Sequence, residues 1–338
     1  MINKIFGSFL LLLFSLNGII VSAQTKTAAP ITTYDGTLSQ YQYPFPVKYF
    51  GLKLENQPLK MVYMDVPAAN KAANAPVVVL LHGKNFFGAY WKNTISYLAQ
   101  NGFRVIVPDQ VGFGKSDKPS LHYSFHQLAA NTKKLLDTLG VKKVNVVGHS
   151  MGGMLATRFA LMYPEFTQKL ILENPIGLED YRQLVPFQSL DQAYATELKT
   201  TEESVQKYHQ SYYTKWQPAY DEWVQVPGAQ TRSPDYSKVA LASAQTYDMI
   251  YQQPVVHEFP NVKVPTLLII GQADRTVVGK GLIKDAKILA RAGQYPALGK
   301  NTATAIPNAK LIELPNVGHI PHLEATAAFH QALSNFLK

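Results

Sequence analysis

The stretch 144–153 reads VNVVGHSMGG: four strand-forming residues and a glycine, then Ser150 enclosed by small residues. A helix is predicted over 150–163, directly after this strand. Gly148 and Gly152 would let the backbone turn sharply from strand to helix and hold Ser150 in a strained conformation. Such a turn lifts the hydroxyl off the sheet edge and aims the free N–H groups of the helix at whatever the serine attacks. The pattern therefore predicts a nucleophile, the alternative being a purely structural turn.

Short apolar runs alternate with amphipathic stretches on both sides of this turn. Strands without polar alternation, separated by helices, indicate a parallel sheet covered on both faces. The strands are predicted at 77–81, 103–108, 144–147, 169–173, 266–270 and 309–314, and the helices near 89–101, 124–139, 150–163 and 321–337. Two further strands, 47–54 and 59–66, are expected to pair antiparallel across a turn at 56–58. The expected fold is α/β, with eight mostly parallel strands.

The alternation breaks near Pro175. Residues 176–262 contain no convincing strand but many tyrosines and tryptophans. We interpret this stretch as a helical cap inserted into a core made of residues 47–175 and 263–338. Its aromatic side chains could roof an apolar pocket, or they could form the cap's own core.

The first residues indicate export. Residues 1–23 combine Lys4, a long apolar run and the small-residue sequence Val21-Ser22-Ala23. This pattern predicts a signal peptide cleaved after Ala23 and a secreted or periplasmic protein. An uncleaved membrane anchor is the alternative, but the apolar run is interrupted and shorter than the ~20 residues of a spanning helix. Residues 24–46 are expected to form an extended lead-in.

Composition excludes several classes of protein. The chain has 338 residues, of which 46% are hydrophobic and 16% charged, as in a globular protein. Its net charge is +9, or +8 without the single lysine of residues 1–23, and the basic residues are scattered. We therefore expect no nucleic-acid partner.

The absence of cysteine excludes disulfides. Without a phosphate-binding loop or metal-ligand spacing, no cofactor and no metal are expected. The oligomeric state is left open.

A serine hydroxyl needs a base to become a nucleophile. The stretch PNVGHIPHLE (315–324) follows the last strand and supplies His319. His322 is the competing histidine, but it falls in the first turn of the next helix, where packing or capping is the expected role. His319 is therefore the predicted base.

The base in turn needs a carboxylate to fix its tautomer and stabilise the imidazolium. Asp274, in GQADRTV (271–277), follows the strand at 266–270 and is the predicted acid. Glu173 is the alternative because it follows the preceding strand. Asp109, in a glycine-rich loop before the serine, is assigned to the scaffold. The chain order Ser, Asp, His is that of one known fold.

Two backbone N–H groups should face the oxygen that becomes negative during acyl transfer. One is expected from Met151, the residue after the nucleophile. The other is expected from Lys84, in the loop HGKN (82–85) after the strand 77–81. The Lys84 ammonium could steer acidic substrates, or could face solvent or a carboxylate. His82 and His149 are expected to be hydrogen-bonded supports.

Together these motifs resemble those of the α/β-hydrolase superfamily. The similarity rests on five motifs. They are HGKN as the oxyanion loop, GFRVIVPDQVGFGKSDKP as the loop after the next strand, GHSMGG as the nucleophile elbow, GQADRTV as the acid loop and GHIPHLE as the histidine loop. One departure is the stretch 279–308, which is longer than in many relatives. The resemblance implies cofactor-free hydrolysis, usually of carboxylic esters and less often of an amide, a C–C bond or an imino-peptide.

Serine at the nucleophile position differs from the aspartate of haloalkane dehalogenases and epoxide hydrolases. The expected function is therefore a carboxylesterase with a helical cap, acting on a small-molecule ester. The alternatives are an amidase, a proline-iminopeptidase-like enzyme, a C–C bond hydrolase, or a non-catalytic ligand-binding protein that reuses this fold.

Overall fold

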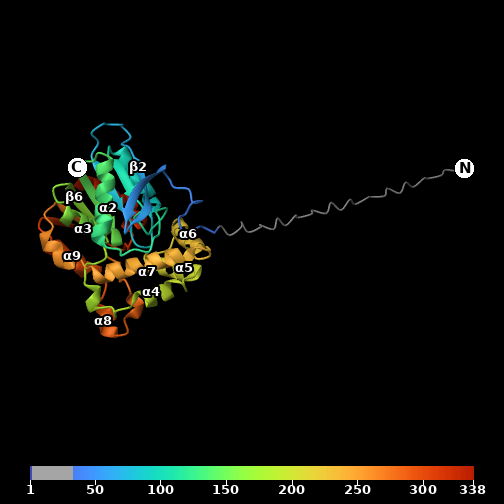
Figure 1. Ribbon diagram of the computed structural model, residues 1–338. Helices are drawn as coiled ribbons and strands as arrows, with labels where there is room; N and C mark the ends of the chain where they lie inside the picture. Colours follow the sequence, from blue (N-terminus) through green and yellow to red (C-terminus); the bar gives the residue numbers. More distant parts are fainter. Residues whose placement is uncertain (2–32) are drawn as a thin grey trace. The chain divides into compact units, whose positions relative to one another are not determined.

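A sheet forms the centre of the fold (Figure 1). It has eight strands in the order β1-β2-β4-β3-β5-β6-β7-β8. The computed structural model describes Met1 and residues 33–338; the predicted signal peptide and the start of the lead-in, within 2–32, lie outside the described residues. β1–β2 and β2–β4 are antiparallel, and the other neighbours are parallel. This confirms the predicted fold class. The strands are β1 (Val47–Leu54), β2 (Gln57–Val66), β3 (Val77–Leu81), β4 (Arg104–Pro108), β5 (Val144–His149), β6 (Thr167–Glu173), β7 (Thr266–Gly271) and β8 (Ala309–Leu314).

The turn between β1 and β2 differs from the expected one. β2 begins at Gln57, and Pro58 already pairs with Lys53, so the turn consists of Glu55 and Asn56 alone. Both turn residues have positive φ, 44° and 64°. Two-residue hairpin turns of this type match the twist of the flanking strands. The predicted turn at 56–58 was therefore wrong: the observed turn begins one residue earlier and ends two residues earlier.

Helices cover both faces of the sheet. The side chains of β3 alternate between two apolar clusters: Val78 and Leu80 pack with α1 and α11, while Val77, Val79 and Leu81 pack with α2 and α3. All five are buried, which explains why the strand lacks polar alternation. The helices of the core are α1 (Lys92–Gln100), α2 (Phe125–Thr138), α3 (Met151–Met162), α8 (Ala286–Arg291), α9 (Tyr295–Ala305), α10 (Pro321–Glu324) and α11 (Thr326–Leu337). The predicted helix 321–337 is thus divided in two.

Residues 176–262 contain only helices and the turns that join them. α4 lies beside α7, and α5 beside α6 (Figure 1). Their bounds are α4 (Leu190–Glu197), α5 (Glu202–Gln210), α6 (Glu222–Gln230) and α7 (Tyr236–Gln252). Short 3-10 turns lie at η1 (Gly88–Trp91), η2 (Tyr181–Gln183), η3 (Pro218–Tyr220), η4 (Val256–Asn261) and η5 (Lys280–Leu282). Among the described residues, no helix is both long enough and apolar enough to cross a membrane.

Candidate active site

Ser150 stands between the end of β5 and the start of α3, with φ 56° and ψ −120°. A non-glycine residue rarely adopts positive φ, and such strain costs about 1–3 kcal/mol. The two neighbouring glycines are required by close backbone approach. A Cβ on Gly148 would lie 2.1 Å from the Gly152 oxygen, and one on Gly152 would lie 2.1 Å from the Leu81 oxygen. The sharp strand-to-helix turn expected from the sequence is present.

The structure brings together the three side chains predicted to form a triad. Ser150, Asp274 and His319 follow β5, β7 and β8, whose carboxyl ends lie at one edge of the sheet. His319 Nε2 lies 2.9 Å from Ser150 Oγ, and His319 Nδ1 lies 2.6 Å from Asp274 Oδ2. All three residues are buried. A hydroxyl, an imidazole and a carboxylate thus form one hydrogen-bonded chain.

Asp274 is held in its charged form by its neighbours. Burial raises the pKa of Asp274, but the His319 ring and the hydrogen bonds from His319, Asn174 and Thr276 outweigh burial and lower that pKa below its ordinary value. Asn174 Nδ2 donates to Oδ2 at 2.8 Å, and the Thr276 N–H donates to Oδ1 at 2.8 Å. Sequence reasoning missed Asn174; its position directly after β6, at the same sheet edge, was the available signal.

The alternative acid and the alternative base bond to one another, whereas Ser150 Oγ bonds to His319. The Glu173 carboxylate accepts hydrogen bonds from the His322 N–H at 2.6 Å and from His322 Nδ1 at 2.9 Å. Burial raises the pKa of Glu173 to about 7 and lowers the pKa of His322 well below its ordinary value. Glu173 also supports the elbow, because its carbonyl accepts the Ser150 N–H at 3.2 Å. The pair is therefore placed to support the triad.

The loop after β3 orients the Lys84 N–H. The Gly83 carbonyl accepts hydrogen bonds from His82 Nδ1 at 2.9 Å and from the Phe86 N–H at 3.2 Å. Because a trans peptide is planar, fixing this carbonyl also fixes the Lys84 N–H on the opposite side. Met151 is the first residue of α3, where a helix leaves its N–H groups unpaired. Within residues 33–338, neither of these N–H groups donates to another protein group.

A buried chain of hydrogen bonds connects this loop to the histidine loop. The Gly83 N–H donates to the Tyr90 hydroxyl at 3.1 Å, and that hydroxyl lies 3.0 Å from His149 Nδ1. His149 Nε2 lies 2.8 Å from the carbonyl oxygen of His319 and can only donate there. Hence His149 Nδ1 accepts the Tyr90 proton. Burial lowers the pKa of His149 to about 3, so this neutral form persists at neutral pH. Its predicted role as a support fits these contacts.

Replacing Tyr90 with phenylalanine should break this chain at its centre. The change leaves the Gly83 N–H without its acceptor and His149 Nδ1 without its donor. Removing an oxyanion donor outright typically costs 10²–10³ in kcat, and a disturbed donor should cost less, about 10-fold. Turnover with KM measured separately checks this, with Tyr97→Phe as the control because no hydrogen bond of that hydroxyl is found among the described residues. Equal kcat in the Tyr90 and Tyr97 variants would contradict the role of Tyr90 in positioning the loop that carries the Lys84 N–H.

Ser150 lines a cavity of about 670 Å³. The walls come from core loops on one side and from α4, α5, α6 and α7 on the other. The lining surface is mainly apolar, although many of the lining residues are polar. The aromatic members are Phe86, Phe87, Phe113, Tyr208, Tyr212, Tyr236 and Tyr247. Other aromatic residues of 176–262, such as Trp223 and Tyr220, are buried in the packing instead. Some aromatic residues of 176–262 therefore line the cavity, and others form the packed interior, as the two alternatives from the sequence allowed.

Tyr212 joins the helical segment 176–262 directly to His319. Its carbonyl accepts the His319 N–H at 2.7 Å, and its ring stacks on the imidazole with 4.8 Å between centroids. The Tyr212 hydroxyl accepts a hydrogen bond from Asn85 Nδ2 at 2.8 Å. A residue outside the core thus fixes both the backbone and the ring plane of the histidine.

The Lys84 ammonium faces a carboxylate, one of the two outcomes considered from sequence. Its Nζ donates to Ser243 Oγ at 2.6 Å and lies 3.6 Å from Glu197 Oε1. Ser243 Oγ in turn donates to Glu197 Oε1 at 2.8 Å. The charge at this wall of the cavity is therefore already paired with α4 and α7.

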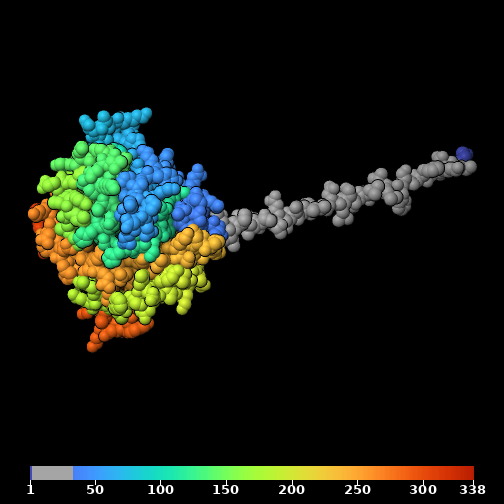
Figure 2. Space-filling model, in the orientation of Figure 1, coloured from blue at the N-terminus to red at the C-terminus, as the bar shows by residue number. Residues whose placement is uncertain are grey.

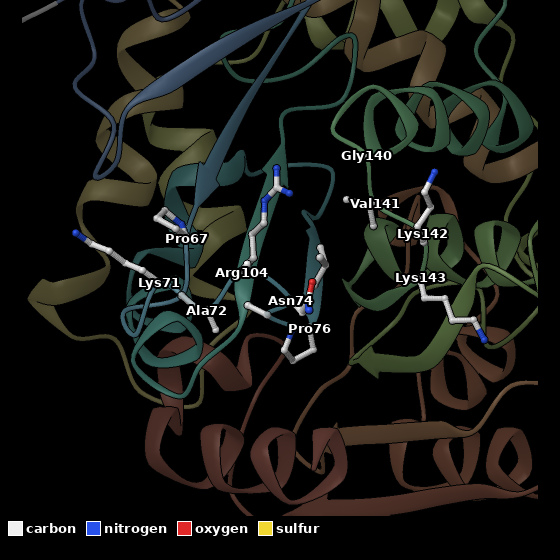
Figure 3. A pocket seen from close by; sticks show the side chains of 14 residues that line it. Pro67, Lys71, Ala72, Asn74, Pro76, Arg104, Gly140, Val141, Lys142 and Lys143 are labelled. Atoms are coloured by element: carbon white, nitrogen blue, oxygen red, sulfur yellow. The ribbon is translucent and has the colours of Figure 1, made fainter.

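A second hollow, of about 430 Å³, lies at the amino ends of β3 and β4 (Figure 3). None of its lining residues is a serine, a histidine or an acid. Lys71 and Lys143 point away from one another (Figure 3). The Arg104 guanidinium is held by Asp65 at 2.8 Å. The hollow therefore lacks both a nucleophile and converging charges, and the site lies at the cavity with Ser150.

Comparison with known proteins identifies the family to which this architecture belongs. A family model for the alpha/beta hydrolase fold matches residues 76–326. The chain belongs to the α/β hydrolase family. A solved structure of this α/β hydrolase fold, a probable hydrolytic enzyme from Pseudomonas aeruginosa, is 47% identical with a TM-score of 0.88, covering 91% of this chain and 99% of that one.

Two curated α/β hydrolase relatives are each 30% identical over 275 residues, covering 79% of this chain and 90% of theirs. One is a 2-hydroxy-6-oxononadienedioate/2-hydroxy-6-oxononatrienedioate hydrolase from Comamonas testosteroni, and the other is a 2-hydroxy-6-oxo-6-phenylhexa-2,4-dienoate hydrolase from Burkholderia cepacia. The chain is accordingly a hydrolase, and family membership alone leaves open which bond it cleaves.

Proposed function

We propose that this α/β hydrolase cleaves carboxylic esters of small, largely apolar molecules through an acyl-enzyme intermediate. The observation that carries the proposal is the chain from Ser150 through His319 to Asp274, with distances of 2.9 Å and 2.6 Å, at the wall of an apolar cavity. In this arrangement Nδ1–H of the imidazole donates to the carboxylate, and Nε2 is free to accept the serine proton.

The reaction follows from these contacts. His319 Nε2 takes the proton of Ser150 Oγ as that oxygen attacks the acyl carbonyl. The N–H groups of Lys84 and Met151 stabilise the oxyanion of the tetrahedral intermediate. The imidazolium then gives its proton to the leaving alkoxide, and the acyl group stays on Ser150. In the second half, His319 activates a water molecule that releases the acid, while Asp274 stabilises the imidazolium in both steps.

The charged side chains that line the cavity are Lys84, Lys118, Lys199 and Glu197. The contacts of Lys84 favour an apolar ester over a dianionic substrate at that wall. The two curated relatives are named for substrates with one or two carboxylates. Here the Lys84 ammonium is already bonded to Ser243 and paired with Glu197, so binding a substrate carboxylate there would break existing contacts. C–C bond hydrolysis is the second candidate, supported by the 30% identity to those relatives.

A side-by-side substrate panel tests the choice. We expect the highest kcat/KM for p-nitrophenyl esters, and lower values for matched arylamides and for 2-hydroxy-6-oxo-6-phenylhexa-2,4-dienoate. Glu197→Gln is an informative variant because it frees the Lys84 charge; it should raise relative activity toward carboxylate-bearing substrates. A wild-type preference for the dienoate over every ester would contradict the ester proposal and favour the second candidate.

We also propose that the chain is exported and cleaved after Ala23, as its first residues indicate. Mass spectrometry of the protein recovered outside the cytoplasm should then find Gln24 as the first residue. Ala23→Asp, which places a charge at the cleavage site, should slow processing. Recovery of the mature population with Met1 still attached would contradict the proposal.

A further inference from the structure

Residues 34–45, here called the strap, precede β1 and lie outside the part that matches the family model. The strap lies against α6 and the start of α7 (Figure 2). The hydrogen bonds of this connection include Gly36 N–H to Asp235 Oδ1 at 3.0 Å, Gln230 Nε2 to the Asp35 carbonyl at 3.0 Å, and the Tyr41 hydroxyl to Glu222 Oε1 at 2.5 Å. The strap is therefore bound to the helical segment.

The strap is equally bound to the core. Lys115 Nζ donates to the Leu38 carbonyl at 2.6 Å, and the Tyr43 hydroxyl donates to Asp109 Oδ2 at 2.5 Å. The rings of Tyr41 and Tyr43 pack against Phe87, with centroids 5.3 and 5.6 Å away. Phe87 is itself a wall of the cavity that contains Ser150. The strap thus spans the junction between core and helical segment beside the substrate cavity.

Leu38 is the residue of the strap that reaches the cavity. It is 1% exposed and lines the same cavity as Ser150. Its φ is 49°, which is unusual for leucine and persists only where surrounding contacts impose it. Those contacts are present: the Leu38 N–H donates to the Asp35 carbonyl at 3.1 Å, and Asp35 Oδ1 accepts the N–H groups of Thr37 and Ser39. The turn therefore holds the Leu38 side chain at the cavity wall, although this requires a strained backbone conformation at Leu38.

We propose that the strap closes one end of the substrate cavity and that Leu38 sets the length of chain the cavity accepts. The inference rests on the proposed function, because it concerns the substrate of the same site. An aliphatic side chain at a closed end excludes further methylenes of the substrate by steric contact. Shortening that side chain should convert its volume into room for a longer apolar group.

The test compares Leu38→Gly and Leu38→Ala with the wild type. Leu38→Gly removes the side chain and also suits positive φ, so the turn should persist. Leu289→Ala is the matched control, since Leu289 is 38% exposed on α8 and is not part of the cavity wall. Two ester series are measured: graded acyl chains on one phenol, and graded alcohols on one acyl group. Circular dichroism melting confirms that each variant is folded.

In one of the two series, the Leu38 variants should accept longer chains, with kcat/KM rising about 4-fold for each methylene beyond the wild-type limit. The control should keep the wild-type profile. Folded Leu38 variants with unchanged profiles in both series would overturn the inference. If the wild type cleaves no ester, the proposed function fails instead, and labelling rates with fluorophosphonates of graded alkyl length then decide whether Leu38 limits the cavity.

Discussion

Replacing Ser150 with alanine is expected to lower kcat by about 10⁴- to 10⁶-fold, because the variant loses the hydroxyl proposed to form the acyl-enzyme. Residual turnover should come from the oxyanion donors and the cavity, which the substitution leaves in place. KM should change little, since the lost hydroxyl acts on the reacting carbon and contributes little to binding. Steady-state kinetics with the best p-nitrophenyl ester measures both quantities.

Covalent labelling gives an independent measurement of the same residue. A fluorophosphonate should modify wild-type Ser150 stoichiometrically, and peptide mapping should place the adduct in the stretch 144–153. Ser237→Ala is the control because Ser237 is an exposed serine on α7. If the Ser150→Ala variant were fully labelled, or turned over substrate at the wild-type rate, Ser150 would not be the nucleophile. A protein that only binds ligands with this fold would leave the wild type unlabelled as well.

The sequence predicted the strands well because parallel strands buried on both faces are continuous apolar runs. The bounds of β3 and β8 agree with the prediction to the residue. The β1–β2 turn was placed wrongly because Glu55 and Asn56 adopt positive φ without the glycine that usually marks such a turn. The local pattern there favoured Pro58, whereas pairing between the strands determined where the turn lies.

The predicted triad residues could be found because Ser150 directly follows β5, while Asp274 and His319 lie in the short loops after β7 and β8. Residues at the carboxyl ends of parallel strands gather at one sheet edge. Two of the supporting contacts had no comparable signal. The bond from Tyr90 to His149 and the stacking of Tyr212 on His319 join residues from separate elements, and only the folded chain brings them together. Leu38 lies in a lead-in without periodicity, so nothing in the sequence distinguished it from neighbouring residues.

Replacing Asp274 with asparagine should lower kcat by about 10³- to 10⁴-fold while the fold persists. The amide has nearly the same shape as the carboxylate, but it carries no charge to stabilise the imidazolium and can turn its NH₂ toward His319 Nδ1. That orientation would favour the tautomer with the proton on Nε2, which cannot accept the serine proton. Ester turnover and the rate of fluorophosphonate labelling should fall together, because both require an activated Ser150.

The matched control is Glu173→Gln, the same chemical change at the alternative acid. Glutamine keeps an oxygen that can accept the His322 N–H, and burial already favours the neutral form of Glu173. We therefore expect a kcat loss of no more than about 10-fold, consistent with support through hydrogen bonds worth roughly 1 kcal/mol each. If kcat of the Glu173 variant fell by about 10⁴-fold and the Asp274 variant remained active, Glu173 would be the catalytic acid. We expect the larger loss of kcat in the Asp274 variant. His319 Nδ1 bonds directly to Asp274 Oδ2 at 2.6 Å, whereas the Glu173 carboxyl group is bonded to His322.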